Sequence, residues 1–192
     1  MPGPRPPLPF AAAITAGGQS RRFGQDKALY RVDGVPMLER VAASLQACAP
    51  RLLIAPPGRY DLPGWTVTPD LRPGLGPLAG LEAALTALPQ GAEWVAYSAV
   101  DLPYLTARYW ALLHAAVTPG AQAVVGRDEE GRGQPLAALY HRSALGAVQA
   151  HLDRQDLRMR SLMDALQVQA VTWPQVRDAA PLAFTNLNRP PA

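Results

Sequence analysis

The sequence predicts an α/β fold in which helices cover both faces of a mostly parallel, twisted sheet. Short apolar runs of strand length alternate with segments of helical period along the chain. Several of the apolar runs lead directly into loops that contain glycine or aspartate. The chain has 192 residues, 48% hydrophobic and 17% charged, which fits one globular domain rather than a disordered chain.

The first elements are a tail, a strand and a helix. Residues 1–9 are rich in proline, and we expect a flexible tail there and a single domain over residues 10–192. Phe10–Thr15 is an apolar run before two glycines, which predicts a buried strand entering a Gly-rich loop. Pro36–Ala49 has apolar residues at helical spacing and proline near its first turn, which predicts a helix.

The rest of the chain continues the alternation. We expect further strands at Arg51–Ala55, Trp65–Thr68, Trp94–Ala99, Ala121–Gly126, Pro135–Tyr140 and Gln167–Val171. Helices are expected at Leu78–Leu88, Ala107–Val117, Ser143–Leu152 and Ser161–Leu166. The segment after residue 171 reads as irregular. In such folds ligands bind beyond the carboxyl ends of the strands.

Composition excludes several classes of protein. Cys48 is the only cysteine, so a disulfide framework, a zinc ribbon and an iron–sulfur cluster are excluded and a reducing cytoplasm is favoured. The net charge of +3 is too small and scattered to indicate a nucleic-acid partner. No apolar run approaches the roughly 18 residues of a membrane span, and the N-terminal residues lack the apolar core of a secretory signal.

One basic residue differs from all the others. Of the 18 Lys and Arg residues, 17 are arginine and Lys27 alone is lysine. This bias looks like drift toward GC-rich codons, which would replace lysine wherever charge alone matters. A compact ammonium fits beside phosphates where a planar guanidinium does not, so Lys27 is a candidate phosphate-binding residue. Asn186 and Asn188 are likewise the only two asparagines, and an extended segment would place both on one face.

Lys27 ends a polar loop that reads TAGGQSRRFGQDK from Thr15. The loop lacks both the Walker A pattern and the dinucleotide pattern G-x-G-x-x-G. Its adjacent glycines would still let backbone N–H groups approach an anion. Arg21, Arg22 and Lys27 add three positive charges, so the loop is a candidate phosphate cradle.

Two aspartates follow predicted strands. Asp101 comes after the strand expected at Trp94–Ala99, where a carboxylate and substrate phosphates could share Mg²⁺, or Mn²⁺ in its place. Asp70 occupies a similar position beside a second glycine-rich segment, Gly74–Gly80. A structural turn or helix cap remains the alternative for each aspartate.

Together these motifs resemble the molybdenum cofactor guanylyltransferases, the MobA family, over about residues 10 to 190. The loop from Thr15 to Lys27 is similar to that family's opening motif, L-A-G-G-x-S-x-R-M-G-x-D-K. The other matching segments are Gly34–Leu38, Asp70 with Gly76–Gly80, Val100–Pro103, and Asn186–Asn188 with Pro190. The chain departs from the pattern at Thr15, Phe23 and Val100, and carries Ala55 where some members have a base-contacting asparagine.

The resemblance implies a Rossmann-like nucleotidyltransferase fold and a reaction. GMP would pass from GTP to the terminal phosphate of Mo-molybdopterin, giving the guanine dinucleotide cofactor and pyrophosphate. The catalytic candidates are Lys27, Asp101 and Arg22, with Asp101 as the metal ligand. Nucleotide binding would involve Thr15, Ala16, Gly17, Gly18, Lys27, Asp70 and Asp101, and Asn186 and Asn188 would face the pterin with the loop at residues 127–134.

The implied partners are GTP, Mo-molybdopterin, molybdenum-insertion proteins and the molybdoenzymes that accept the cofactor, with the chain itself a monomer. One alternative is a nucleotidyltransferase that uses CTP on the same pterin, or another nucleotide on another phosphate. The Gly17–Gly18 pair and Asp26–Lys27 favour the guanylyl branch, because the cytidylyl relatives more often show A-A-G. A sugar-1-phosphate nucleotidyltransferase would usually need an additional C-terminal domain. The other alternative is a non-catalytic nucleotide-binding adaptor, which the presence of Lys27 and Asp101 disfavours.

Overall fold

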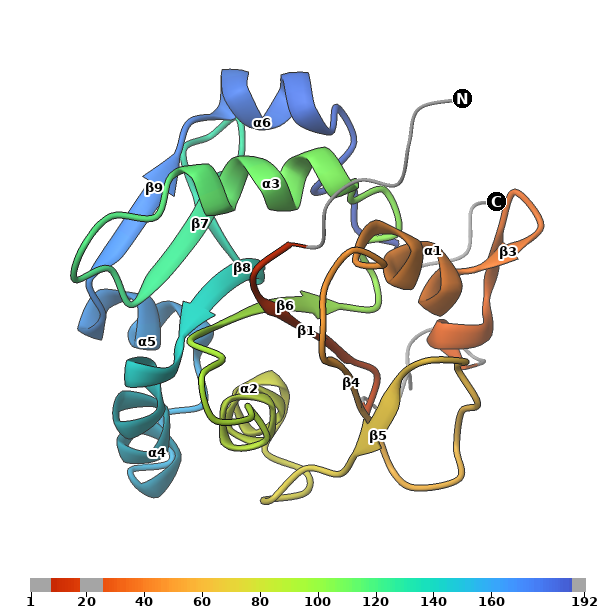
Figure 1. Cartoon of the computed structure of the whole chain (residues 1–192), viewed down its shortest axis with the longest axis horizontal. Coiled ribbons are helices and arrows are strands. Elements are labelled where there is room, and N and C mark those ends of the chain that lie inside the picture. The colour runs from red at the N-terminus through yellow and green to blue at the C-terminus, as the bar shows by residue number, and fades with distance from the viewer. Residues whose placement is uncertain (1–7, 18–25, 188–192) are drawn as a thin grey trace.

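A seven-stranded sheet forms the centre of the structure, with helices on both of its faces (Figure 1). The structure is a computed structural model that describes residues 8–17 and 26–187. The strand order is β5-β4-β1-β6-β8-β7-β9. The α/β class predicted from the alternating pattern is therefore confirmed.

Most neighbouring strands in this sheet are parallel. The strands are β1 (Ala11–Thr15), β4 (Arg51–Ile54), β5 (Thr66–Thr68), β6 (Trp94–Ala99), β7 (Ala123–Arg127), β8 (Gly133–His141) and β9 (Val168–Val171). β5, β4, β1 and β6 pair in parallel, as do β7 and β9, while β8 runs antiparallel to both β6 and β7. The carboxyl ends of the first four strands consequently meet at one edge of the sheet.

Each face of the sheet packs against its own group of helices. One group is α1 (Met37–Ser44), α3 (Ala107–Ala115) and α6 (Trp173–Ala179); the other is α2 (Pro77–Thr86), α4 (Leu145–Asp153) and α5 (Met159–Ala165). Because side chains alternate along a strand, Ala12 and Ile14 of β1 face the first group and Ala11 and Ala13 face the second.

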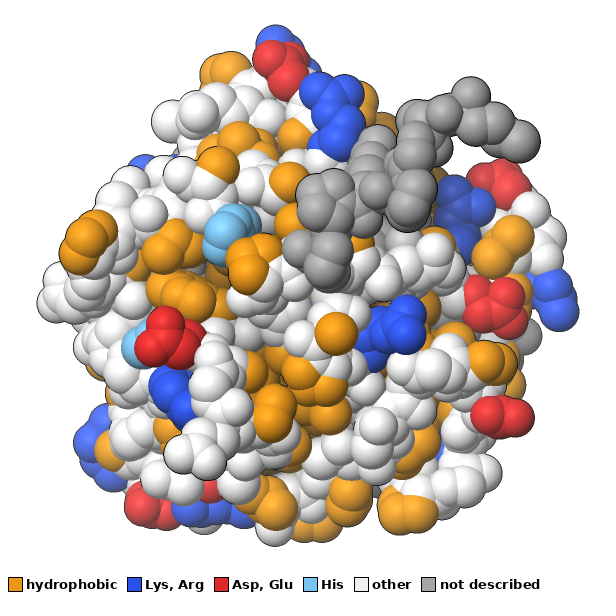
Figure 2. Space-filling model, in the orientation of Figure 1, with side chains coloured by type: hydrophobic (Ala, Val, Ile, Leu, Met, Phe, Trp, Pro, Cys, Tyr) orange, Lys and Arg blue, Asp and Glu red, His pale blue; other side chains and the backbone are white. Residues whose placement is uncertain are grey.

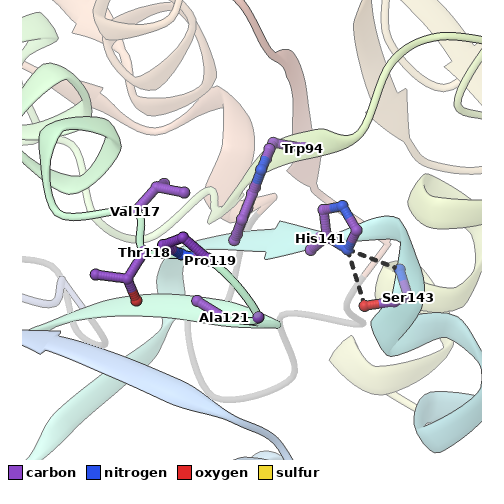
Figure 3. Close-up of a pocket in the computed structure, with 8 residues that line it drawn as sticks. Trp94, Val117, Thr118, Pro119, Ala121, His141 and Ser143 are labelled. Atoms are coloured by element: carbon purple, nitrogen blue, oxygen red, sulfur yellow. Dashed lines mark hydrogen bonds between the residues drawn. The ribbon is translucent and has the colours of Figure 1, made fainter.

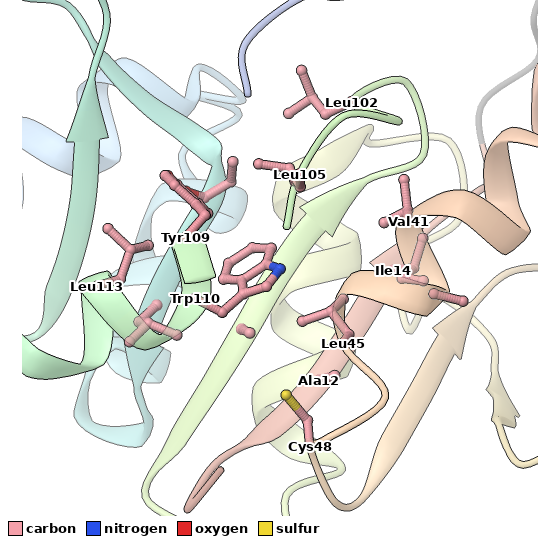
Figure 4. Packing of buried hydrophobic residues seen from close by; sticks show 14 of the residues in the cluster. Ala12, Ile14, Val41, Leu45, Cys48, Leu102, Leu105, Tyr109, Trp110 and Leu113 are labelled. Atoms are coloured by element: carbon pink, nitrogen blue, oxygen red, sulfur yellow. The ribbon is translucent and has the colours of Figure 1, made fainter. Parts of the chain in front are cut away.

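The core on the first face is built around Trp110 of α3, which is completely buried (Figure 4). Its ring lies among apolar side chains of α1, β1 and α3, including Leu45 and Leu113. Burying an indole N–H without a partner would be costly, and here it donates to the Ser44 hydroxyl at 3.1 Å. This hydrogen bond ties α3 to α1, which contacts the short turn at Lys27–Leu29.

The structure differs from the sequence-based expectation at several elements. A short hairpin, β2 (Arg31–Val32) and β3 (Val35–Pro36), and the helix α6 were not predicted, because two-residue strands and a seven-residue helix carry little periodicity. The helix expected to reach Ala49 ends at Ser44. One expected helix divides into a 3₁₀ turn, η2 (Arg142–Ala144), and α4.

The expected tail is also corrected at its inner end. The Leu8 N–H donates to the Ala47 carbonyl at 2.8 Å, and Leu8 forms a bridge with Cys48. Leu8 therefore belongs to the folded part of the chain, although residues 1–9 were expected to form the tail. Among the helices of the described part, none is long and apolar enough to cross a membrane.

Candidate active site

The carboxyl edge of the sheet brings together residues that the sequence separates widely. Ala16 and Gly17 continue from β1, Asp70 lies two residues beyond β5, and Asp101 lies two residues beyond β6. Lys27 begins a 3₁₀ turn, η1 (Lys27–Leu29), at the far end of the Gly-rich loop. The predicted convergence of these segments on one sheet edge is therefore observed.

Lys27 and Asp101 are in direct contact. The Lys27 Nζ lies 2.9 Å from the Asp101 Oδ2, and the two side chains are only 15% and 19% exposed. Such a pair is shielded from water, so its electrostatic interaction is stronger than that of a surface ion pair. Two of the three residues singled out as catalytic candidates thus form one charged centre.

The C-terminal segment completes this centre. The Asn186 side-chain amide donates to the same Asp101 Oδ2 at 2.9 Å, and the Leu187 N–H donates to the Asp101 carbonyl at 3.3 Å. The second carboxylate oxygen, Oδ1, is buried and has no hydrogen-bond partner among the described residues. An orphaned anionic oxygen of this kind fits a cation ligand, because Mg²⁺ is commonly held by one or two carboxylates plus phosphates. Within residues 8–17 and 26–187, no three or more acidic, His or Cys side chains are grouped so as to hold a metal ion, so Asp101 would act with few other protein ligands.

Asp70 lies against the backbone of Gly17. A Cβ atom added at Gly17 would stand 3.4 Å from the Asp70 Oδ2, and the other oxygen of Asp70 is buried without a partner in the described structure. Burial raises the pKa of the Asp70 carboxyl above its ordinary value. An unpaired acceptor beside a glycine backbone is suited to receive a donor from a ligand.

Thr15 has a more internal role than its place in the motif suggests. Its hydroxyl points toward α2, 3.1 Å from where a Cβ of Gly80 would stand, and its carbonyl accepts from the Val100 N–H at 3.2 Å. The Tyr97 hydroxyl lies in the same place and donates to the Pro77 carbonyl at 2.6 Å. Gly80 therefore lets α2 approach the ends of β1 and β6 closely.

Sequence reasoning missed a cluster around Asp26. Arg59 and Tyr60, from the loop after β4, both bond to the Asp26 carboxylate. No spacing in the sequence marks them, because they reach Asp26 only through the fold. Asp26 is thus surrounded by hydrogen-bond donors.

A second missed group holds the loop between Asp70 and α2. Arg72 pairs with Glu82, whose side chain is 3% exposed, at 3.2 Å, and also with Asp153 of α4. These ion pairs attach the loop that precedes Gly74 to both α2 and α4. The remaining predicted site residues, Gly18, Arg22 and Asn188, lie outside the described residues.

A hollow of about 260 Å³ lies between the β7–β8 loop and the C-terminal segment, and we call it the C-terminal hollow. Asp128 anchors its loop by accepting from the backbone N–H of Arg132 at 2.8 Å and from the Gln134 amide at 3.1 Å. The opposite wall includes Trp173, Phe184 and Thr185. Thr185 lines the hollow and directly precedes Asn186, whose side-chain amide donates to Asp101. The hollow is therefore connected to the Lys27–Asp101 pair through two consecutive residues.

A larger pocket of about 390 Å³ lies at the other end of β6, where Trp94 and His141 line it (Figure 3). Trp94 begins β6 and Asp101 follows its end, which separates them by roughly 20 Å at about 3.3 Å per residue. On the face shown in Figure 2, side chains of both charges are scattered without forming a large patch of one sign. The chemistry-bearing residues are therefore at the opposite edge of the sheet from this pocket.

The sequence of this chain is similar to those of known nucleotidyltransferases. Residues 12–171 match the family described as "MobA-like NTP transferase domain". A Deinococcus radiodurans protein named "Probable molybdenum cofactor guanylyltransferase" is 51% identical over 183 residues, which cover 95% of this chain and 91% of that relative. A protein of the same name from Opitutus terrae is 38% identical over 82% of this chain and 79% of its own length.

Solved structures share the fold. Molybdopterin-guanine dinucleotide biosynthesis protein A from Archaeoglobus fulgidus has a TM-score of 0.77 at 21% identity, covering 94% of this chain and 93% of its own. A 2-C-methyl-D-erythritol 4-phosphate cytidylyltransferase from Thermus thermophilus has a TM-score of 0.67 at 21% identity, with the same two coverages. By the family match and the sequence identity of its relatives, this chain belongs to the MobA-like NTP transferase family and is a nucleotidyltransferase.

Proposed function

We propose that this protein transfers GMP from GTP to the terminal phosphate of Mo-molybdopterin, forming molybdopterin guanine dinucleotide and pyrophosphate. The names of the relatives that are 51% and 38% identical support the reaction. The observation that carries it in the structure is the contact of Lys27 with Asp101 at the carboxyl edge of the sheet. The CTP-dependent alternative is not favoured by these relatives.

The reaction needs positioning more than acid–base machinery. An oxygen of the pterin phosphate attacks the α-phosphorus of GTP, the new P–O bond forms, and the bond to the β-phosphate oxygen breaks to release pyrophosphate. The second pKa of a phosphate monoester is about 6, so the attacking group is already largely anionic at neutral pH. What remains is charge neutralisation and in-line orientation, which Lys27, the loop amides and Arg22 would supply.

Asp101 would hold a divalent cation, Mg²⁺ or Mn²⁺. Its buried Oδ1 has no partner among the described residues, while Lys27 and Asn186 share its Oδ2. When bound, the cation would neutralise phosphate charge. Lys27 and Asn186 would keep the Asp101 carboxylate oriented so that Oδ1 faces the phosphates.

The nucleotide and the pterin would occupy different parts of the edge. Thr15, Ala16, Gly17 and Gly18 would contact GTP, with Asp70 near the base or ribose. The C-terminal hollow, together with Asn186 and Asn188, would take the pterin. A fused-ring pterin is planar and polar, and the aromatic and hydrogen-bonding walls of the hollow suit that chemistry.

The decisive experiment is pyrophosphate release by the purified protein with GTP, CTP or ATP, each with and without Mo-molybdopterin. We expect release only with GTP and the pterin together. Equal release with CTP would replace the guanylyl assignment by the cytidylyl alternative. Nucleotide binding without release under any condition would indicate an adaptor.

The Asn residues can be tested separately. Replacing Asn188 by alanine should weaken retention of molybdopterin and leave GTP affinity within a few-fold, whereas Asn186→Ala should also disturb Asp101, to which the Asn186 amide donates. Loss of GTP binding with intact pterin binding would reverse that assignment. We further propose that the protein acts in the cytoplasm as a single-domain monomer, receives its pterin from molybdenum-insertion proteins and passes its product to molybdoenzymes.

A further inference from the structure

The Asp26 carboxylate accepts hydrogen bonds from three residues. The Tyr60 hydroxyl lies 2.9 Å from each of its oxygens, and Arg59 donates to Oδ2 through two nitrogens at 2.9 and 3.2 Å. The backbone N–H of Ala28 donates to Oδ1 at 3.0 Å. Hydrogen bonds to a charged acceptor are roughly twice as strong as neutral ones, so Asp26 is firmly held.

Tyr60 also reaches the other end of the Gly-rich loop. Its hydroxyl lies 3.2 Å from the Ala16 carbonyl and 2.9 Å from Asp26, so its single proton is shared between an acceptor that enters the loop and an acceptor that leaves it. Tyr60 is 8% exposed and its ring packs in the core with Ala16 and Ala28. Burial first, and the hydrogen bond to Asp26 second, raise the pKa of the Tyr60 hydroxyl, which keeps it protonated as a donor at neutral pH.

Lys27 is the residue most affected by this arrangement. It lies between Asp26, which Tyr60 and Arg59 hold, and Ala28, which is 1% exposed in the core. The Lys27 backbone is therefore fixed on both sides, and its side chain extends to Asp101. Displacing Asp26 would move the base of that side chain directly.

We propose that Tyr60 is a positioning residue that fastens the two ends of the Gly-rich loop together and so holds Lys27 in place for phosphoryl chemistry. This role rests on the proposed nucleotidyl transfer, but it assigns no substrate contact to Tyr60. Arg59 supports it by neutralising Asp26 and occupying its Oδ2, whereas the Oδ1 of Asp101 has no partner among the described residues.

The test compares Tyr60→Phe with Tyr140→Phe. Both variants remove one hydroxyl from a buried tyrosine, but Tyr140 donates to the Pro135 carbonyl at 2.8 Å on the other face of the sheet. We expect Tyr60→Phe to lower kcat for pyrophosphate release about tenfold, the scale of one lost hydrogen bond to a charged group. Its KM for GTP should change less than kcat, and Tyr140→Phe should keep the wild-type kcat.

A second measurement needs no substrate. The Ala28 N–H donates to the Asp26 carboxylate. Its hydrogen exchange should become faster in Tyr60→Phe and stay unchanged in Tyr140→Phe. Unchanged protection, or faster exchange with unchanged kcat, would overturn the positioning role. If the wild-type protein released no pyrophosphate, the proposed function would fail, and unchanged or faster exchange at Ala28 would still decide whether Tyr60 holds the loop.

A double-mutant cycle with Asp26→Asn closes the test. Because Tyr60 is proposed to act through Asp26, the losses in kcat from Tyr60→Phe and Asp26→Asn should not add. Additive losses would show that the hydroxyl acts by another route and would overturn the proposal.

Discussion

The Lys27 ammonium contacts the Asp101 carboxylate at 2.9 Å across 74 residues of sequence. One group ends the Gly-rich loop and the other follows the central strand β6, so the pair exists only when β1 and β6 are neighbours. Asn186 adds a third contribution from near the end of the chain. The pair is the most direct target for experiment.

Replacing Lys27 by arginine should reduce kcat for pyrophosphate release on the order of 10²-fold, as expected when a transition-state charge contact is lost. The guanidinium keeps the charge, but its planar fork can engage both oxygens of Asp101, including the buried Oδ1. Arg108→Lys, an exposed exchange on α3, serves as the control and should leave kcat unchanged. Near-normal turnover of Lys27→Arg would make the solitary lysine an accident of composition.

Asp101→Asn should fold normally and lose most activity, by about 10²-fold or more. The amide oxygen can still accept from Lys27 and Asn186, so the local hydrogen bonds survive while the charge is lost. Thermal unfolding would report the fold, and a Mg²⁺ titration of activity would report the metal. A folded variant with full Mg²⁺-dependent activity would exclude Asp101 as the principal metal ligand and direct attention to Asp70.

Asp70→Asn should raise the unfolding temperature at pH 7 while weakening GTP binding. Burial raises the pKa of Asp70 in the folded state, so the ionised form costs stability at pH values above that raised pKa. The advantage of the variant should shrink as the pH falls from the raised pKa of folded Asp70 to the ordinary aspartate value of about 3.9, because the carboxyl of the folded wild-type protein becomes neutral over that interval. An advantage independent of pH would exclude the ionisation of Asp70 as its cause.

Two glycine substitutions should change stability in opposite directions. A Cβ at Gly80 would stand 2.6 Å from the Tyr97 hydroxyl and 3.1 Å from the Thr15 hydroxyl, so Gly80→Ala should destabilise by about 1–3 kcal/mol. A Cβ at Gly146, in α4, would meet nothing within 4 Å, and Gly146→Ala should stabilise by up to about 1 kcal/mol. Chemical denaturation measures both; equal effects of the same sign would contradict the close approach of α2.

The sequence was sufficient for the seven-stranded sheet and for the convergence of three of its loops at one edge. β6 begins and ends as predicted at Trp94 and Ala99, because a short apolar run, interrupted only by Ser98, follows Glu93 and leads into Asp101 and Pro103. The loops after β1, β5 and β6 were marked by glycine and aspartate, which are the residues that the carboxyl edge requires.

What the sequence could not predict are contacts that depend on the folded geometry. Tyr60 and Arg59 look like ordinary loop residues, and only the path of the chain after β4 brings them to Asp26. Arg72 reaches Glu82 and Asp153 for the same reason. The helix α6 was missed because its seven residues are stabilised by packing on α3 and β7 more than by their own periodicity.

The walls of the C-terminal hollow also give the protein a natural optical reporter. Of its four tryptophans, Trp173 is the one that lines this hollow, whereas Trp94 lines the distant pocket and Trp110 is sealed in the core. Indole emission responds to what touches the ring, so a pterin entering the hollow would alter the fluorescence of Trp173. Occupancy of the C-terminal hollow could thus be followed in real time without a label. The variant Trp173→Phe would lack this change in fluorescence.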